Sequence, residues 1–432
     1  MTTELTPYPL RAKIAQEIGA RGSIPFSRYM ELCLYDPVLG YYSRNAERFG
    51  KAGDFYTSSD VHAVFGRLMA RQFEEMWRVL GSPDQITIKE LGPGRGLFAQ
   101  DVLDWSEKKF PDFFQALHYV LVEQSPALRE PIESTLKSHL ESGKAEFALD
   151  SPPSRTKGQA GSVEGGQAFD SGESGKGTSS TPAEPRLNTD RASAPEGYTP
   201  RSDLSVPTIV FANEFFDALP VEVVTTKGSL RIDVQGQRFV EAWVPASDEE
   251  LEFLDRYSVR PEEGERIEVP LQSLAAMRAA CDFDRGFLIV IDYGYTRAEQ
   301  LAGRHRGTLK AIRQHAVNAN PYEAPGEQDI TADVNFTALA AAAEKSGLRA
   351  QKIVTQSQFL MGIGEKNQFA DAFEDCGRPQ ERAKVALQLK HLVTPAGMGE
   401  SFHALIASKG VEAEKVQALA GLSFGKSAQR RN

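Results

Sequence analysis

The sequence predicts an α/β fold built on a doubly wound parallel sheet, with a helical segment before it and an accessory insertion within it. Short apolar runs rich in β-branched residues alternate with runs whose apolar residues recur at helical spacing. The run GFLIVIDYGY is apolar almost throughout, which is typical of a central strand buried on both faces. A glycine-rich stretch, ELGPGRG, follows the first strand-like run of the alternation and precedes a helix-like run. Together these features favour an α/β sheet with a ligand loop at its edge.

The composition is that of a globular protein and limits what it can bind. Of 432 residues, 41% are hydrophobic and 25% charged. The net charge of −10 argues against a broad nucleic-acid interface, which needs a basic face, although a local basic patch stays open. No apolar run reaches membrane-spanning length and the first residues lack the apolar core of a signal peptide, so we expect a soluble, cytoplasmic protein.

The three cysteines lie far apart in the sequence, at Cys33, Cys281 and Cys376. They form no CxxC motif and no cluster with histidine, so no metal site is expected. We expect buried free thiols that act as small apolar side chains, as in a protein of a reducing compartment.

Residues 1–80 are predicted to be mainly helical. Two short helices are expected within residues 8–34, because Leu10, Ile14 and Ile18 recur at helical spacing. A long loop containing FGKAGDFYTSSDV follows, and then an amphipathic helix over VHAVFGRLMARQFEEMWRVLG that ends at Gly81.

The alternation of strands and helices follows over residues 81–410. ITIKEL, LHYVLVEQ and AEFALD are predicted strands, separated by a helix at 97–109 and another over PALREPIESTLKSHL. Residues 151–206 are rich in Gly, Ser and Pro and nearly free of aliphatic side chains, so they are predicted to be a disordered insert within the domain.

The alternation resumes after the insert with TIVFANEFF as a fourth strand. An accessory insertion at about 225–285 contains a predicted hairpin that turns at Gln235 and Gly236. GFLIVIDYGY, a helix over VNFTALAAAAEKSGL and a last strand over FHALIASKG complete the domain, and residues 411–432 are expected to be a frayed tail.

The glycine loop favours a particular ligand. Gly92, Gly94 and Gly96 allow close approach of a ligand to the backbone, and the helix after them offers free N–H groups. The dinucleotide pattern GxGxxG would need glycine at 97, where the chain has Leu97, and the phosphate-loop ending GK[ST] is absent. GxGxG with Glu90 before it suits S-adenosylmethionine (SAM), whose ammonium group a carboxylate can meet. The alternative is a purely structural turn.

Glu123 ends the second predicted strand, where nucleotide-binding α/β folds place an acid for a ribose diol. It lies 29 residues after Gly94, farther than the usual spacing of about 20, but the intervening helix is long. The alternative is an ordinary surface glutamate at the end of a strand.

Several long motifs occur in an order that resembles one family, the MidA-type SAM-dependent methyltransferases. The motifs are GYYS with FGKAGDFYTSSDVHAVFG, ELGPGRG, LVEQSPALR, FANEFFDALPV, VIDYGY, GTLKAIRQH and DITADVNFTAL. The likeness covers about residues 8–410 and fails across 151–206. It implies a class I SAM-methyltransferase (Rossmann-like) fold with SAM as cofactor. Mitochondrial members are assembly factors of respiratory complex I, and characterised members methylate arginine in its quinone-site subunit.

The resemblance also implies residues that contact the cofactor. Asp54, Phe55 and Thr57 match the family's GDF loop, which lies over the cofactor; the alternative is a loop packed for structural reasons alone. An aromatic face beside a sulfonium would act through a cation–π contact. Pro93 of the glycine loop and Asn213 after the fourth strand complete the expected cofactor-binding set.

The stretch NEFFDALP supplies the candidates for the acceptor side. An arginine acceptor carries a planar cation with no free lone pair, so its site needs carboxylates that hold the guanidinium group. Glu214 is expected to orient the acceptor, and Asp217, three residues on, to assist it from the same side of a helical turn. The alternatives are a helix cap for Asp217 and a structural partner for Glu214.

Asp292 ends the fifth strand beside Tyr293 and is the third catalytic candidate. It is expected either to bind the substrate or to tie down the GTLKAIRQH loop. His315 in that loop is a candidate proton acceptor or a structural residue. Residues 304–306, RHR, are expected to be a solvated surface turn.

The sequence therefore favours a SAM-dependent protein-arginine N-methyltransferase that supports complex I assembly. One alternative keeps the enzyme class and changes the acceptor to a small molecule or RNA. Another is a non-catalytic assembly chaperone that retains the fold. The expected partner is a protein, a complex I subunit; nucleic acid is not expected, and a homodimer is left open.

Overall fold

The computed structural model describes residues 9–44, 63–148, 205–313, 316–318 and 320–424. The expected cofactor-covering residues Asp54, Phe55 and Thr57, residues 151–204 of the expected insert, and His315 lie outside these ranges. Residues 1–148 and those from Ser205 onward belong to the same structural unit. Within the described part of the chain, no helix is both long and apolar enough to cross a membrane.

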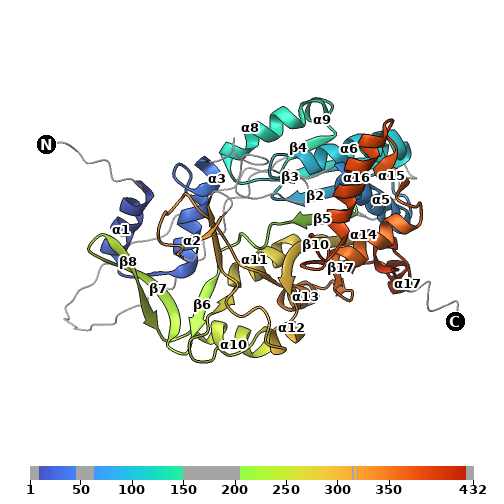
Figure 1. Ribbon diagram of the computed structural model, residues 1–432. Helices are drawn as coiled ribbons and strands as arrows, with labels where there is room; N and C mark the ends of the chain where they lie inside the picture. The colour runs from blue at the N-terminus through green and yellow to red at the C-terminus, as the bar shows by residue number, and fades with distance from the viewer. Residues whose placement is uncertain (1–8, 45–62, 149–204, 314–315, 319, 425–432) are drawn as a thin grey trace, which may run out of the picture. The chain divides into compact units, whose positions relative to one another are not determined.

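The fold is organised around a large mixed sheet with strand order β15-β17-β10-β5-β2-β3-β4 (Figure 1). The five strands β10, β5, β2, β3 and β4 run parallel, as predicted for a doubly wound sheet. In the described residues the sheet contains β2 (Ile86–Leu91), β3 (Leu117–Val122), β4 (Ala145–Phe147), β5 (Thr208–Asn213), β10 (Gly286–Tyr295), β14 (Val334–Asn335), β15 (Arg349–Ala350), β16 (Val354–Thr355) and β17 (Phe402–Lys409).

The expectation of a wholly parallel sheet was wrong at one side. β17 is antiparallel to β10, and β15 and β16 are antiparallel to β17. The chain enters β17 beside the carboxyl end of β10, where Gly294 N–H donates to Ser401 O at 3.3 Å, so β17 must run back across the sheet. Alternation of strands and helices in a sequence does not reveal this direction.

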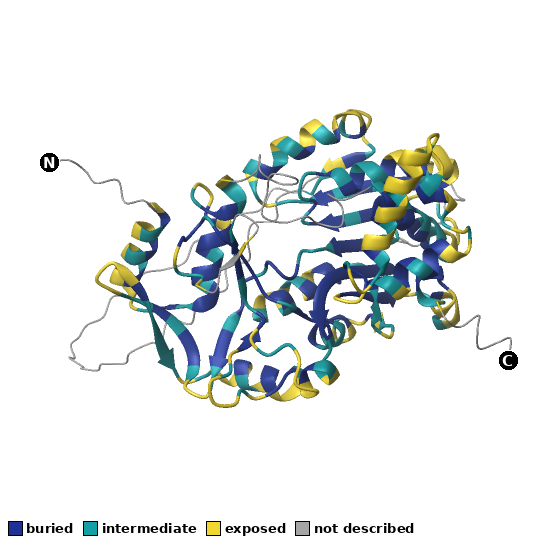
Figure 2. Cartoon of the chain, in the orientation of Figure 1, coloured by how far each residue is buried: buried dark blue, intermediate teal, exposed yellow. Residues whose placement is uncertain are grey.

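β10 is the central strand, as its composition predicted: all ten of its residues are buried (Figure 2). Successive side chains point to opposite faces of a strand, so β10 contributes to two cores. Ile289 and Ile291 join the core beneath α5 and α6, and Leu288 and Val290 join the core beneath α11 and α13.

Helices cover both faces of the large sheet. The predicted strand 86–91 and helix 97–109 are confirmed with the same bounds, whereas the single helix expected after β3 is divided at Leu136. The flanking helices are α5 (Ala63–Val79), α6 (Leu97–Lys109), α7 (Pro111–Ala116), α8 (Pro126–Thr135), α9 (Lys137–Glu141), α11 (Leu271–Ala280), α13 (Phe336–Lys345), α14 (Gln356–Glu365), α15 (Ala370–Phe373) and α16 (Pro379–Val393).

A second sheet joins the N-terminal residues to the accessory insertion. The predicted hairpin is confirmed, and Gln235 pairs with Arg238 across its turn. Ile24 of β1 pairs with Ile232 of β7, so α1 and α2 pack on this sheet. The sheet consists of β1 (Ile24–Pro25), β6 (Glu222–Thr225), β7 (Gly228–Gln235), β8 (Arg238–Val244) and β9 (Ile267–Val269). A separate three-stranded sheet consists of β11 (Lys310–Arg313), β12 (Ala316–Asn318) and β13 (Asp329–Thr331). The helices of these regions are α1 (Pro9–Arg21), α2 (Phe26–Tyr35), α3 (Tyr41–Arg44), α10 (Asp248–Tyr257) and α12 (Arg297–Leu301).

The expectation of a frayed tail after residue 410 was wrong for its first part. Helix α17 (Ala413–Gln417) and a 3₁₀ helix at Ala420–Leu422 pack on the large core. Ala420 N–H donates to Glu75 Oε2 at 2.8 Å, and Gly421 N–H donates to Gln72 Oε1 at 2.9 Å. Apolar burial and these two bonds to α5 hold the segment in place.

Candidate functional site

The predicted site residues that the structure describes gather at one edge of the large sheet. β2, β3, β5 and β10 are parallel, so their carboxyl ends meet at the same edge, where ligands of open α/β sheets bind. Four features lie at this edge: the glycine loop, Glu123, the loop at 213–217, and Asp292. Among the described residues the accessory sheet shares no strand with the large sheet, and residues of α2 and of the separate three-stranded sheet β12-β11-β13 approach this edge.

The three glycines of the loop all have positive φ but differ in their surroundings. A Cβ on Gly92 (φ +64°) would lie 2.8 Å from the Phe215 ring, and one on Gly96 (φ +76°) would lie 3.2 Å from Leu136. A Cβ on Gly94 (φ +56°) would meet no described atom within 4 Å. Two glycines therefore serve close packing, while Gly94 faces open space beside the start of α6.

Glu90 is buried beneath the glycine loop, 4% exposed. The Tyr119 hydroxyl donates to its Oε2 at 2.8 Å. Burial raises the pKa of Glu90 to about 8, only partly opposed by the Tyr119 hydrogen bond. A buried carboxyl of this kind is ready to lose its proton when a cation approaches.

Glu123 follows β3 at the start of the loop before α8. Its Oε1 accepts the Ser125 N–H at 2.7 Å, and the Arg129 guanidinium donates to its backbone carbonyl at 3.1 Å. Burial raises the pKa of the Glu123 carboxyl, which the backbone N–H groups oppose. The side chain is thus fixed at the strand end rather than projecting as an ordinary surface glutamate.

The loop after β5 is not the helical turn that we expected for Glu214 and Asp217. Residues 214–219 form bends and a turn, so Asp217 caps no helix either. Glu214 has a φ of +49°, which non-glycine residues rarely adopt. Asn213 Nδ2 donates to Glu214 Oε1 at 3.2 Å, while Asn213 Oδ1 is buried without a hydrogen-bond partner in the described part of the chain.

Asp292 fixes this loop from β10. It is fully buried, and its Oδ2 accepts three consecutive backbone N–H groups, those of Phe215, Phe216 and Asp217, at 3.0–3.3 Å. Burial raises the pKa of Asp292 well above its usual range, and the charges of Asp217 and Glu214 raise it further. Of the two roles expected for Asp292, tying down a loop fits the geometry, but the loop is 215–217 and not GTLKAIRQH.

Asp217 receives a short hydrogen bond from the same strand. The Tyr293 hydroxyl donates to Asp217 Oδ2 at 2.5 Å. Asp217 is 6% exposed, and its Oδ1 is buried with no hydrogen-bond partner among the described residues. Burial raises the pKa of Asp217 to about 6, against the lowering effect of Tyr293.

Other residues at this edge were missed or left without a role by the sequence analysis. The Tyr35 hydroxyl at the end of α2 donates to Ala218 O at 2.9 Å, and the Tyr42 hydroxyl donates to Asp329 Oδ1 at 3.1 Å. Ala332, within the DITADV motif, donates its N–H to Asp217 O at 3.0 Å. The motif could have pointed to this contact, but the tyrosines come from segments that only the tertiary fold brings here.

An enclosed cavity behind the loop is too small for a ligand. It measures about 10 Å³, room for roughly one water molecule, and is lined by Phe216, Tyr295 and Asp333 among others.

Comparison with family models finds one match over most of the chain. Residues 68–354 match the family described as "Putative S-adenosyl-L-methionine-dependent methyltransferase". The matched range contains the glycine loop, Glu123, the 213–217 loop and Asp292.

Related proteins cover nearly the whole chain. A Drosophila melanogaster protein named "Protein arginine methyltransferase NDUFAF7 homolog, mitochondrial" is 29% identical, covering 93% of this chain and 84% of its own length. The Danio rerio protein of the NDUFAF7 name is also 29% identical, covering 90% of this chain and 84% of its own. A solved structure from Burkholderia thailandensis with S-adenosyl-homocysteine bound is similar with a TM-score of 0.72 and 26% identity, covering 96% of this chain and 95% of that one.

Proposed function

The chain belongs to this family of S-adenosyl-L-methionine-dependent methyltransferases, and from that premise we propose that its acceptor is an arginine side chain of a protein. SAM is its cofactor, and bound SAM supplies an electrophilic methyl group on a sulfonium. The arginine acceptor is supported by the names of the relatives from Drosophila and Danio and by the chemistry of the 213–217 loop.

The observation that carries the proposal is Asp217 Oδ1, a buried acceptor oxygen with no hydrogen-bond partner among the described residues; Asn213 Oδ1, on the cofactor side of the same loop, also has none there. A buried polar atom without a partner costs about 1–3 kcal/mol, so such atoms at a ligand-binding edge favour a ligand that donates hydrogen bonds. A guanidinium group presents five N–H donors in one plane and no acceptor. Acidic Glu214 beside these atoms adds the charge that a cationic acceptor needs.

The surroundings of the glycine loop fit the cofactor. Open space over Gly94 admits close approach of a ligand to the backbone, and Glu90 lies beneath with a proton that it can give up to form a charge pair with an ammonium group. We assign cofactor contacts to Glu90, Glu123 and Asn213, and to the loop residues Gly92, Pro93, Gly94 and Gly96.

The acceptor-side residues have different roles in binding the acceptor, accepting its proton and positioning the loop. Glu214 orients the guanidinium, and Asp217 holds a second edge of it and accepts the proton that the attacking nitrogen must lose. Asp292 touches neither ligand; it is a positioning residue that holds the 215–217 backbone, and through it both acids. Alignment of acceptor and methyl group and exclusion of water then provide the rate enhancement.

For the acceptor protein we propose the quinone-site subunit of respiratory complex I, as the family resemblance implies. The test is transfer of a labelled methyl group from SAM to an extract of cells that lack this protein, with the product located by mass spectrometry. Asp217→Asn and the matched change Asp233→Asn, in the distant β7–β8 hairpin, would be compared, with SAM binding measured in both.

We expect label on an arginine of that subunit, a loss of at least about 100-fold in transfer by Asp217→Asn with SAM binding retained, and no loss by Asp233→Asn. Label on another residue type or molecule would leave the methyltransferase and remove the proposed acceptor. No label with confirmed SAM binding would favour a non-catalytic assembly role.

A further inference from the structure

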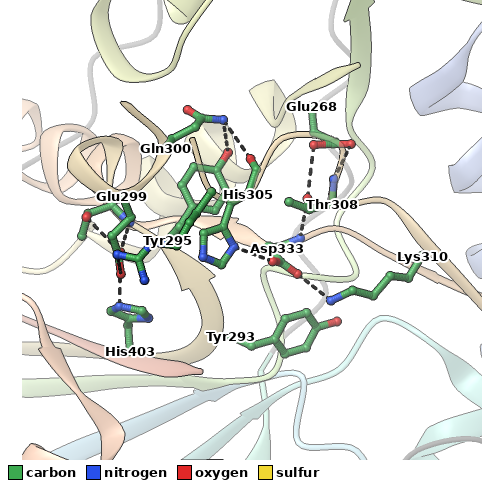
Figure 3. Close-up of polar contacts among 12 residues, drawn as sticks. Glu268, Tyr293, Tyr295, Glu299, Gln300, His305, Thr308, Lys310, Asp333 and His403 are labelled. Atoms are coloured by element: carbon green, nitrogen blue, oxygen red, sulfur yellow. Dashed lines mark hydrogen bonds and ion pairs between the residues drawn. The ribbon is translucent and has the colours of Figure 1, made fainter. Parts of the chain in front are cut away.

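A chain of contacts runs from Asp217 on the acceptor side to the RHR turn, which was expected to be a solvated surface turn. Figure 3 shows its part from Tyr293 and Lys310 through Asp333 to His305. Tyr293 donates to Asp217 at 2.5 Å, and Lys310 Nζ lies 5.1 Å from the centroid of the Tyr293 ring. Asp333 Oδ1 accepts from Lys310 at 2.8 Å, and its Oδ2 is 3.0 Å from His305 Nδ1. These residues come from β10, β11, the 304–306 turn and the DITADV motif, which had no assigned role.

The Tyr293 ring is held from two sides. Phe402 packs edge-on against it with ring centroids 5.6 Å apart, and Lys310 contacts it as a cation–π partner. Tyr293 is 9% exposed, so the ring has little freedom to turn. Its hydroxyl therefore stays on Asp217 Oδ2, and a cation against the face of the phenol ring makes that hydroxyl a stronger donor, which favours the ionised form of the Asp217 carboxyl.

Asp333 is itself fixed in position. His305 has a φ of +54°, which is strained for histidine, and stacks on Tyr295 with ring centroids 5.1 Å apart. Asp333 N–H donates to Thr308 Oγ1 at 3.1 Å. The side chain of Asp333 is 12% exposed, so the carboxylate that binds Lys310 is mostly buried.

We propose that Lys310 and Asp333 are a positioning pair for the acceptor site, in which Lys310 keeps the Tyr293 hydroxyl on an ionised Asp217. Asp333 neutralises the ammonium, so that a cationic acceptor is not repelled. The pair touches neither SAM nor acceptor. The expected effect of the pair on methyl transfer rests on the proposed function, whereas its expected effect on the ionisation of Asp217 does not.

Several other charged or titratable groups act on Asp217 and must stay constant in a test. From β10 these are Tyr293 and Asp292, from α2 Tyr35, and from the loop after β13 Asp333. Glu214 lies in the loop of Asp217 itself. Lys310→Met keeps all of these side chains but removes an ion-pair partner of Asp333, whose charge raises the pKa of Asp217, so both consequences act in the same direction.

The first test is carbon NMR of the full-length protein with labelled aspartate carboxyl carbons, titrated with acid. The Asp217 signal is identified by its loss in Asp217→Asn. Its midpoint, near pH 6 in the native protein, should rise by about 0.5–1 unit in Lys310→Met, because the cation against the Tyr293 ring is removed and the charge of Asp333 is no longer balanced by it; the rise is modest because Lys310 is partly exposed. Lys310→Arg should restore most of the native midpoint.

The matched control is Lys345→Met, which removes a lysine 5.5 Å from the Tyr257 ring. It should leave the Asp217 midpoint unchanged, whatever it does to stability. An Asp217 midpoint that is the same in Lys310→Met and the native protein would overturn the proposal.

The second test uses the methyl-transfer assay with cell extract. The rate of methyl transfer is measured against pH. In Lys310→Met, the fall of this rate on the acid side should move to higher pH by the same amount as the NMR midpoint. A shifted midpoint without transfer by the native protein would refute the proposed function and leave the positioning of Asp217 intact. A shifted midpoint with an unshifted fall of the rate on the acid side would show that Asp217 is not the group that controls transfer.

Discussion

The glycine loop and the 213–217 loop follow neighbouring strands, β2 and β5, yet they offer opposite chemistry to a ligand. Both loops contain residues with positive φ, at Gly94 and Glu214. Gly94 presents bare backbone and open space, whereas the 213–217 loop has three N–H groups bonded to Asp292 and presents acidic side chains instead.

Under the proposed function, the difference lets one sheet edge hold two cations next to each other. On the cofactor side the carboxyl group of Glu90 lies under the loop, where burial raises its pKa to about 8. On the acceptor side the backbone donors are already occupied by a buried carboxylate, so a ligand meets acceptor oxygens. The following three predictions test whether each loop has the character assigned to it.

The largest effect is expected for Glu214→Gly. Turnover should fall by about 100-fold or more, because the acceptor loses its orienting carboxylate. The free energy of unfolding should rise by about 0.5–1 kcal/mol, because glycine adopts positive φ without strain. Methyl transfer and urea unfolding measure the two effects.

Ser82→Gly is the matched control for that variant, since Ser82 has a φ of +51° in the turn after α5. It should gain similar stability with unchanged turnover. If Glu214→Gly retains turnover, the acceptor loop does not work through this carboxylate.

The next effect concerns the glycine loop. Gly94→Val should weaken SAM binding by about 100-fold, because a side chain would fill the space through which a ligand approaches the backbone. Calorimetric titration with S-adenosyl-homocysteine measures the binding affinity.

Gly236→Val is the control for this variant. Gly236 has a similar φ of +63°, its added Cβ would also meet no described atom, and it lies in the β7–β8 turn. Equal binding by both variants would refute the placement of the cofactor.

The smallest effect is on stability and concerns Glu90. The folded-state pKa of Glu90, about 8, is above the ordinary value of a glutamate. The neutral Glu90 carboxyl therefore makes its full contribution to the free energy of unfolding below about pH 4.5, and this contribution is lost as the pH rises toward 8. Without ligand, Glu90→Gln should therefore melt higher than the native protein near pH 8, and the difference should shrink toward pH 5.

Melting curves at several pH values, with and without S-adenosyl-homocysteine, measure the Glu90 effect. The ligand should stabilise Glu90→Gln less than the native protein, because the variant cannot form the charge pair. Glu141→Gln, which changes a side chain 69% exposed, should show neither effect. A pH-independent difference in melting temperature would mean that Glu90 is not protonated in the free protein.

Much of the fold could be predicted because local patterns specify it. The run ITIKEL followed by glycines and a helical period fixed β2 and α6, and the unbroken apolar run fixed β10 as the central strand. The direction of β17 and the pairing of β1 with β7 could not be predicted, since both depend on where distant segments meet.

The sequence by itself determined the class of chemistry: the glycine loop, the acids at successive strand ends and the ordered motifs together indicated a SAM-dependent methyltransferase, and the comparisons confirm that class. Only the tertiary structure decided what each acid does. Asp292, near the end of β10, is buried beneath three N–H groups, whereas Asp217, in the loop after β5, keeps an oxygen with no hydrogen-bond partner in the described part of the chain. The role of a carboxylate depends on its burial and its hydrogen-bond donors, and these come from segments far away in the sequence.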